Sequence, residues 1–368
     1  MLKALKNHYW RLHLLLTSHE KLARLSRSPS RASVPFPIKT PSRIYLELTY
    51  TLWTHGQADE TYYAQNIHHL GRSVRRHYIS YPNFRRMRDH ANKHKSSSLD
   101  YTIILRDKVL FDRYFRSTGI RLPNLVWQGE DVSLSKAVES LSKANLTTNE
   151  ENQSGRRFFF KPALGIKGED VFHVELEPNA TDALAAERTS PPPFLKGRWL
   201  AQEALRQHPV LAALNASSVN TLRIVTYLNR DSEPVVYLAY LRTGRAGRVV
   251  DNAASGGIIV SLDQKTGILR KPAYLMNGSS ATLISKHPDT GTELTSHQLP
   301  FFFEALAQTL EAHRALPQVH SIGWDVALTE TGPVLLEGND DWGGNSVMWL
   351  SKDFQNDLKI IFDASEPA

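Results

Sequence analysis

The pattern of apolar and polar positions divides the chain into short strands and helices. Apolar runs, or apolar residues in alternation with polar ones, predict strands at 157–161, 222–228, 235–242, 324–328 and 333–337. The turn-rich residues 229–234 predict a hairpin between the second and third strands, and residues 329–332 predict another between the last two. Strands of this kind, interspersed with helices, predict an α/β fold of the α+β type with antiparallel pairing.

Helical spacing of apolar residues predicts three helices. Residues 1–26 carry leucines at helical intervals, and residues 107–118 place four apolar or aromatic side chains on one face. Gly119 suits the C-terminal end of the second helix, and Pro300 opens the third.

Proline-rich and polar stretches separate these elements. Residues 26–41 contain four prolines and predict a linker, residues 93–98 are a second polar break, and residues 188–196 predict a loop. The sequence therefore separates a basic helical arm and linker, 1–43, from an aromatic helical region, 44–100. The length of 368 residues fits two or three structural units in all.

Composition excludes several kinds of chemistry. The chain has no cysteine, which excludes disulfides, thiolate nucleophiles and cysteine-bound zinc. Its longest apolar runs fall well short of the ~18 residues that a membrane-spanning helix needs, and we find no secretory signal. We therefore expect a soluble cytoplasmic protein.

The positive charge of the chain is concentrated at its start. Residues 1–43 contain nine lysines and arginines and a single acid, Glu20, whereas the formal net charge of the whole chain is +7. Such an arm could bind weakly to an anionic membrane and hold the protein at the inner membrane surface, or it could be a solvated helix with a flexible tether. Aromatic and basic residues also alternate over 44–95, but we interpret these as helix packing and expect no nucleic-acid binding.

Two acids and an asparagine in the last predicted hairpin form a candidate metal site. Asp325 points away from the apolar face of its strand, and a turn at 329–332 would bring it beside Glu337. Asn339 lies two residues further and points the same way as Glu337. Two carboxylates and an amide suit Mg²⁺, with Mn²⁺ as an alternative ion. The alternative interpretation, two surface acids and a turn residue, leaves charges within apolar strands, which is costly.

Basic residues near glycines form candidate phosphate contacts. Lys161 ends an apolar strand and is followed by Gly165 and Gly168, whose flexibility would let backbone amides approach a polyphosphate. Lys108 is a second candidate, although it could equally be a solvated helix residue.

Two arginines on neighbouring predicted strands could face the same pocket. Arg223 and Arg242 can lie on one side of the 222–242 hairpin, where they would stabilise a transferring phosphoryl group, and Asn252 follows in a polar loop. The alternative for each arginine is a surface ion pair.

The order of these motifs resembles the ATP-grasp superfamily. The motifs are the strand lysine with its glycine loop, Gln202-Glu203-Ala204-Leu205, Asn220-Thr221-Leu222-Arg223, and the final Asp325 with Glu337-Gly338-Asn339. Gln207-His208-Pro209 and Ile322-Gly323-Trp324-Asp325 are most similar to the sugar-transfer-associated, or α-L-glutamate ligase-related, ATP-grasp family. The resemblance covers roughly residues 45–350.

This resemblance implies a fold and a set of roles. It implies two lobes, 101–200 and 201–365, that clasp ATP between antiparallel sheets. Lys108, Lys161 and the glycine loop would hold the phosphates, while Gln202, Glu203 and Leu205 would line the adenine site. Arg223, Arg242 and Asn252 would act on the transferred phosphoryl group, and Asp325, Glu337 and Asn339 would bind Mg²⁺.

The implied reaction is ATP-dependent ligation of a carboxylate to an amine through an acyl phosphate. The substrates would be small molecules such as amino acids, amino sugars or sugar nucleotides, in polysaccharide or amino-acid-conjugate biosynthesis. Two alternatives remain open. One is a kinase that acts on a sugar or polymer hydroxyl. The other is a non-catalytic, nucleotide-dependent assembly factor for polysaccharide.

Overall fold

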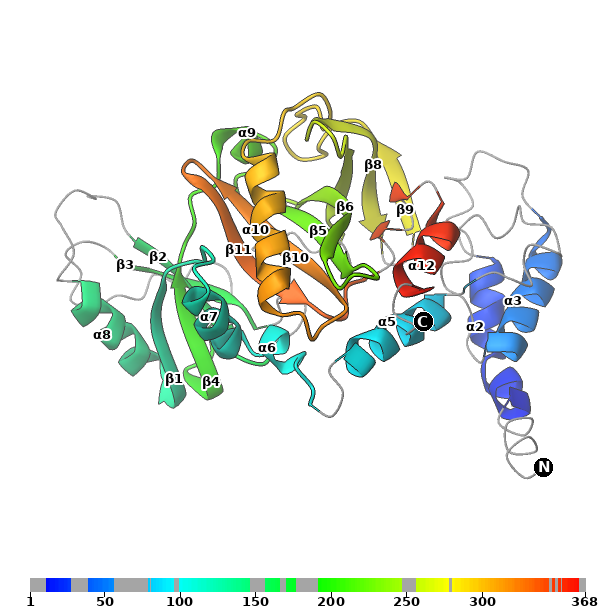
Figure 1. Ribbon diagram of the computed structural model, residues 1–368, viewed down its shortest axis with the longest axis horizontal. Helices are drawn as coiled ribbons and strands as arrows, with labels where there is room; N and C mark the ends of the chain where they lie inside the picture. Colours follow the sequence, from blue (N-terminus) through cyan, green and yellow to red (C-terminus); the bar gives the residue numbers. More distant parts are fainter. Residues whose placement is uncertain are drawn as a thin grey trace.

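A computed structural model describes most of the chain, with two sheets and the helices around them (Figure 1). The described residues are 11–27, 39–55, 79, 81–95, 99–145, 156–165, 170–176, 191–246, 256–277, 280–343, 346–347, 350–351 and 353–363.

The smaller sheet has four antiparallel strands in the order β1-β4-β2-β3, with bounds Leu125–Ser133, Phe194–Glu203, Arg156–Pro162 and Phe172–Leu176. Helix α8 (Leu134–Asn145) covers one face of this sheet. Its apolar residues pack with Phe158 and Phe160, which alternate with Phe159 and Lys161 along β2. This alternation places Lys161 on the sheet face away from α8.

The larger sheet has seven antiparallel strands in the order β11-β10-β5-β6-β7-β8-β9. Their bounds are Gly332–Asn339, Ser321–Thr329, Thr221–Leu228, Pro234–Thr243, Ile258–Leu262, Leu269–Asn277 and Ser280–Ile284. The predicted strands at 222–228, 235–242, 324–328 and 333–337 form β5, β6, β10 and β11. Both predicted hairpins, β5–β6 and β10–β11, are therefore confirmed.

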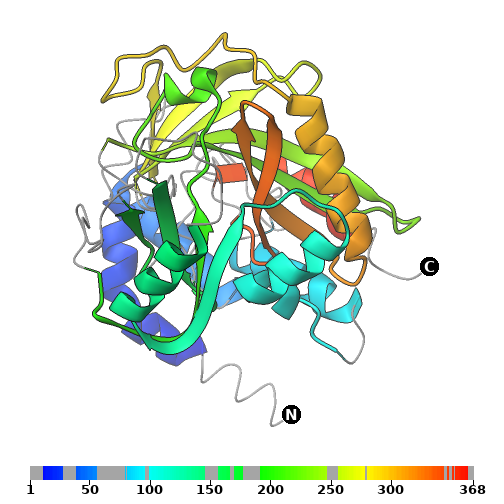
Figure 2. The same ribbon diagram turned by 90° about the vertical axis from the view of Figure 1, so that its left-hand side faces the viewer.

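Two layers of helices cover the larger sheet (Figures 1 and 2). Helix α10 (Phe302–Ala315) packs on one face together with residues of α7 (Lys108–Ser117), while α5 (Tyr81–Lys95) and α12 (Phe354–Asp363) pack on the other. Strand residues alternate between these two cores: Ile258 and Val260 face α10, and Ile259 faces the opposite layer. The short helices α6 (Ile103–Arg106) and α9 (Pro209–Ala212) complete this part of the fold.

The N-terminal helices form a small unit of their own at one end of the molecule (Figure 1). Helix α2 (His19–Ser26) packs on α3 (Pro41–His55) through Leu22, Ile44, Leu48 and Leu52, a cluster separate from the two cores of the large sheet. No described helix combines the length and apolar character needed to cross a membrane.

The predicted helices and loops agree with the structure only in part. Residues 1–10 and 28–38 lie outside the described residues, the helix predicted over 1–26 is interrupted at Ser18, and α5 extends into the polar break predicted at 93–98. The helix predicted at 107–118 is α7, with Asp107 as its N-cap, and Gly119 follows it with a positive φ of 81°. The loop predicted at 188–196 is wrong at its end, because β4 already begins at Phe194. The third helix begins at Phe302, since Phe301 adopts a left-handed conformation with φ 52°.

Candidate functional site

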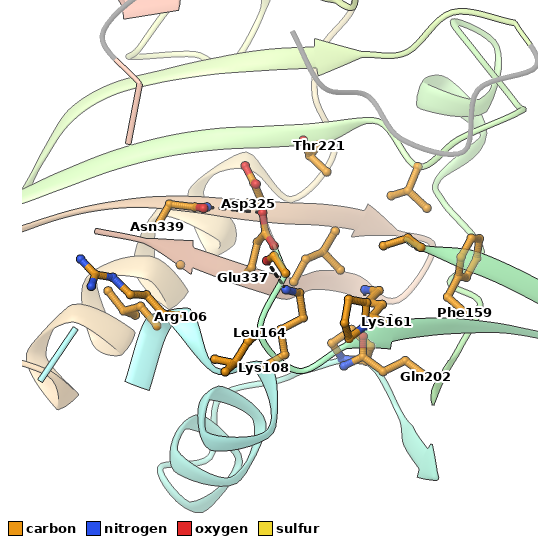
Figure 3. Close-up of a pocket in the computed structure, with 18 of the residues that line it drawn as sticks. Arg106, Lys108, Phe159, Lys161, Leu164, Gln202, Thr221, Asp325, Glu337 and Asn339 are labelled. Atoms are coloured by element: carbon orange, nitrogen blue, oxygen red, sulfur yellow. Dashed lines mark hydrogen bonds between the residues drawn. The ribbon is translucent and has the colours of Figure 1, made fainter. Parts of the chain in front are cut away.

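A cavity of about 710 Å³ lies between the two sheets, and it brings together eleven of the thirteen predicted site residues (Figure 3). These are Lys108, Lys161, Gly165, Gln202, Glu203, Leu205, Arg223, Arg242, Asp325, Glu337 and Asn339. The other two, Gly168 and Asn252, lie outside the described residues.

The β10–β11 hairpin sets Asp325 and Glu337 directly opposite one another, through a bulge beside Asp325 that the predicted turn alone does not specify. The ladder of β10 with β5 then sets Arg223 opposite Asp325. Arg242 lies opposite Thr221, two residues along β5 from Arg223, so both arginines share one face. The register of three neighbouring strands thus places two arginines and two acids around one point.

Both arginines bind the carboxylate of Asp325. Arg223 Nε and Nη2 donate to Oδ1 and Oδ2 at 2.6 and 2.9 Å, a bidentate pair, and Arg242 Nη1 lies 3.0 and 3.2 Å from the same oxygens. Asp325 is only 3% exposed. Burial alone would raise the pKa of Asp325, but the two guanidinium groups outweigh it and lower that pKa to about 2.

Glu337 has the opposite electrostatic situation. Burial raises the pKa of its carboxyl group, and the negative charge of Asp325 raises it further, although Lys108 and Arg223 act against both effects. Asn339 Nδ2 lies 3.4 Å from Glu337 Oε1 and 3.3 Å from the carbonyl oxygen of Gly323. Glu337 is therefore a carboxylate that gains from an additional cation nearby.

Two lysines enter the cavity from the smaller sheet and from α7 (Figure 3). Lys161 Nζ donates to Gln202 Oε1 at 3.0 Å, and Lys108 Nζ donates to the carbonyl oxygen of Gly165 at 2.6 Å. Burial lowers the pKa of both ammonium groups, and Glu337 counteracts this in each case. Asp107 accepts hydrogen bonds from the first amides of α7 and so fixes the helix that carries Lys108.

The proposed adenine segment ends β4 on the cavity wall. The backbone amide of Glu203 donates to the carbonyl oxygen of Asn124 at 3.0 Å, and that of Ala204 donates to the carbonyl oxygen of Arg157 at 2.8 Å. The side chain of Glu203 pairs with Arg156 at 2.8 Å. Leu205, two residues after Glu203, also lines the cavity.

Sequence reasoning missed an ion pair at the far end of the cavity. Arg106 binds Asp340 through two hydrogen bonds of 3.0 and 2.6 Å, and both residues line the cavity with Asp341. The available signal was the position of Asp340 and Asp341 immediately after Asn339.

Part of the chain matches the model of a known protein family. Residues 193–351 match the model of a family described as sugar-transfer associated ATP-grasp. The family prediction is confirmed over these residues. The antiparallel sheets with helices around them are the architecture expected of an ATP-grasp fold. A sequence search of curated proteins finds no match.

Solved structures of two ligases and a synthetase are similar to this chain at low identity. D-Alanine-D-alanine ligase from Helicobacter pylori is 15% identical with a TM-score of 0.41, over 73% of this chain and 63% of that one. L-Amino acid ligase from Bacillus licheniformis is 12% identical with a TM-score of 0.40, over 74% and 50%. N5-carboxyaminoimidazole ribonucleotide synthetase from Thermotoga maritima is 13% identical with a TM-score of 0.38, over 71% and 49%. The aligned part of this chain thus covers between about half and just under two thirds of the length of each of these proteins.

The predicted metal-binding residues fit a hard divalent cation. Asp325 and Glu337 bring carboxylate oxygens side by side and Asn339 adds an amide oxygen, although both oxygens of Asp325 also accept hydrogen bonds from the two arginines. Within the described part of the chain, no group of three or more His, Cys, Asp or Glu residues could hold a metal. Two carboxylates and one amide are the kind of donors that Mg²⁺ takes, because this ion binds few protein ligands and completes its shell with water and phosphate oxygens.

Proposed function

We propose that the protein is an ATP-dependent carboxylate–amine ligase that works through an acyl phosphate. The observation that supports this most strongly is the charge arrangement of the cavity. The whole lining is nearly balanced in charge, but Lys108, Lys161, Arg223 and Arg242 gather around the carboxylates of Asp325 and Glu337. Four cationic groups in one part of a partly enclosed site, beside two carboxylates that would hold a metal ion, favour a polyanion such as a nucleotide triphosphate.

The proposed roles follow from the position of each group. Lys108 from α7 and Lys161 from the smaller sheet would hold the phosphates. Gln202, Glu203 and Leu205 would border the base. Arg223 and Arg242, with Asn252, would neutralise charge on the phosphoryl group during transfer. Asp325, Glu337 and Asn339 would hold Mg²⁺, which when bound would supply further neutralisation of the phosphate oxygens.

The reaction would proceed in two displacements. An oxygen of the substrate carboxylate attacks the γ-phosphorus, the bond to the bridging oxygen breaks, and ADP leaves with the electron pair. The nitrogen of the amine then attacks the acyl carbon, inorganic phosphate leaves, and the amine loses a proton as the amide forms. The protein contributes orientation and positive charge, and neither step requires a side-chain nucleophile.

We further propose that the substrates are small molecules, an amino acid together with an amino sugar or sugar nucleotide, in polysaccharide or amino-acid-conjugate biosynthesis. The match to a sugar-transfer associated family supports this choice. We propose a cytoplasmic location, with weak contact of residues 1–43 to an anionic membrane.

Measuring ADP and inorganic phosphate separately, across a panel of amino acids with and without amino sugars, tests this function. A ligase gives equal amounts of both products and requires both substrates. A kinase gives ADP without free phosphate, since the phosphate stays on the acceptor. Formation of no ADP with any acceptor, while ATP still binds, would favour the assembly factor. The control is Lys161→Met, which should abolish turnover, beside Lys136→Met, which alters an exposed lysine of α8.

A further inference from the structure

Two buried polar residues of α5 bind the backbone that follows Asn339. Arg88 and Asn92 are 1% and 2% exposed, and they lie one helical turn apart. Arg88 Nη1 donates to the carbonyl oxygen of Trp342 at 2.6 Å, and Asn92 Nδ2 donates to the carbonyl oxygen of Asp340 at 2.9 Å. Buried polar groups that bond to distant backbone fix the path of that backbone.

The amide of Asn92 continues the β10–β11 ladder beyond its last residue pair. That pair is Gly323 with Asn339. Past it, Asn92 Nδ2 also approaches the carbonyl oxygen of Ser321 at 3.3 Å, and Asn92 Oδ1 accepts from the amide of Ser321 at 2.9 Å. One side-chain amide thus bonds to both chains at the open end of the hairpin, as a backbone peptide of a third strand would.

The backbone held in this way touches the cavity at two points. Asn339 and Asp340 line it directly. Trp342, whose Nε1 donates to Ser321 Oγ at 3.0 Å, packs so closely on Gly323 that a Cβ there would lie 2.6 Å from Trp342 Cβ and 3.0 Å from Arg223 Nη1. A shift of residues 340–342 would therefore reach both Asn339 and Arg223.

We propose that Asn92 is a positioning residue of the site, with Arg88 as its support, and that it acts by fixing the backbone of residues 339–342. Helix α5 lies before the family match at 193–351, so this function belongs to the N-terminal part of the chain. The part of the proposal that concerns metal and nucleotide rests on the proposed function, whereas the part that concerns backbone order does not.

Two measurements on the full chain test the two parts separately, using Asn92→Ala, the milder Asn92→Ser, and Arg85→Ala as a control on the exposed side of α5. Hydrogen exchange over 337–343 should accelerate about tenfold in Asn92→Ala and stay at the wild-type rate in Arg85→Ala. Binding of Mn²⁺ with a non-hydrolysable ATP analogue should weaken about tenfold, the low end of the loss seen when a group that supports metal ligands is removed.

Each outcome decides one point. Unchanged exchange at 337–343, or acceleration that is equal throughout the chain, overturns the positioning role. Faster local exchange with wild-type Mn²⁺–nucleotide affinity also overturns it, because the order of residues 339–342 would then have no effect on binding at the site. If the wild-type chain itself binds no Mn²⁺–nucleotide, the proposed function fails, while the exchange result still decides the backbone role. Failure of both Asn92 variants to fold would make Asn92 a requirement of the fold and not of the site.

Discussion

Replacing Glu337 with glutamine separates a metal-binding carboxylate from a structural one. Directly opposed residues in an antiparallel pair have Cα atoms ~4.5–5.5 Å apart, so the carboxylates of Asp325 and Glu337 are close neighbours. Two charges about 5 Å apart repel by roughly 3 kcal/mol at an effective dielectric constant of ~20. Lys108 and Arg223 attract Glu337 and offset part of this repulsion. We therefore expect Glu337→Gln to raise the free energy of unfolding by about 1 kcal/mol near pH 7 without metal or nucleotide.

The sign of this effect depends on pH. Because the pKa of Glu337 is raised above its ordinary value of 4.5, its ionised form weakens the fold, and this penalty appears as pH rises through the raised pKa. Below 4.5 the carboxyl group is protonated in both folded and unfolded states. The stability gain of Glu337→Gln should therefore be largest at neutral pH and disappear in acid.

The same substitution should nearly abolish activity. Glutamine keeps the size of the side chain but removes one acceptor oxygen and the charge that would hold Mg²⁺. We expect ATP turnover to fall at least 100-fold, about 3 kcal/mol of transition-state stabilisation at ~1.4 kcal/mol per decade. An ion pair with only a structural role predicts the reverse, a less stable protein with normal turnover.

The assay measures chemical denaturation and ATP turnover on wild type, Glu337→Gln, Asp325→Asn and the double variant. Glu330→Gln is the matched control, because Glu330 is an exposed acid in the turn of the same hairpin. ATP turnover of the double variant should be no lower than that of the less active single variant, since the effects of residues that act as a unit are not additive. Turnover of Glu337→Gln within threefold of wild type would refute the metal assignment.

Three further predictions concern other parts of the molecule. Arg242→Gln removes one of the two cations that bind Asp325, so Mn²⁺ should bind about tenfold more tightly in the absence of nucleotide, while ATP turnover falls. Weaker Mn²⁺ binding in a titration would contradict this prediction. Deleting residues 1–55 should leave turnover within twofold of wild type, whereas deleting 1–40 uncovers the apolar face of α3 and should cause aggregation on size exclusion. Burial lowers the pKa of His313 to about 4, so the free energy of unfolding should fall by up to about 3 kcal/mol as pH drops from 6.5 to 4. In chemical denaturation, His313→Asn should flatten this dependence of stability on pH, and an unchanged dependence would refute the prediction.

The hairpins were predictable because local signals define them. Alternating residues in β5, β6, β10 and β11 lie next to clear turns, so the pairing of these strands follows from the sequence. The exact register of Asp325 with Glu337 does not, because it depends on a bulge beside Asp325. Strands β1, β3, β4 and β7–β9 were not predicted as strands. The pairing of β1 with β4 joins segments distant in sequence, such as Leu125 with Gln202, and no local pattern specifies such a partner. Strands β7–β9 pair with their neighbours along the chain, as Asn277 does with Ser280, so distance does not explain why they were missed.

The candidate site was predictable in its residues but not in its bonds. The sequence indicated that Arg223 and Arg242 could face a pocket, but the number of groups that share Asp325 depends on the exact register of three strands. The contacts of Asn92 with Ser321 and Asp340 connect positions more than 220 residues apart. An asparagine in a basic, aromatic helix gives no sign of such a contact.

The two arginines that bind Asp325 also affect how the protein folds in the absence of metal and nucleotide. In proteins whose fold depends on a metal, the ligands lose their compensating charge when the ion leaves, and chelators unfold the chain. Here Arg223 and Arg242 act as permanent internal counter-ions to the most buried acid of the site. We expect a chelator to leave the melting temperature of the chain unchanged. A newly made chain could then fold fully without divalent ions, and its site would need only small side-chain movements when nucleotide and metal arrive together.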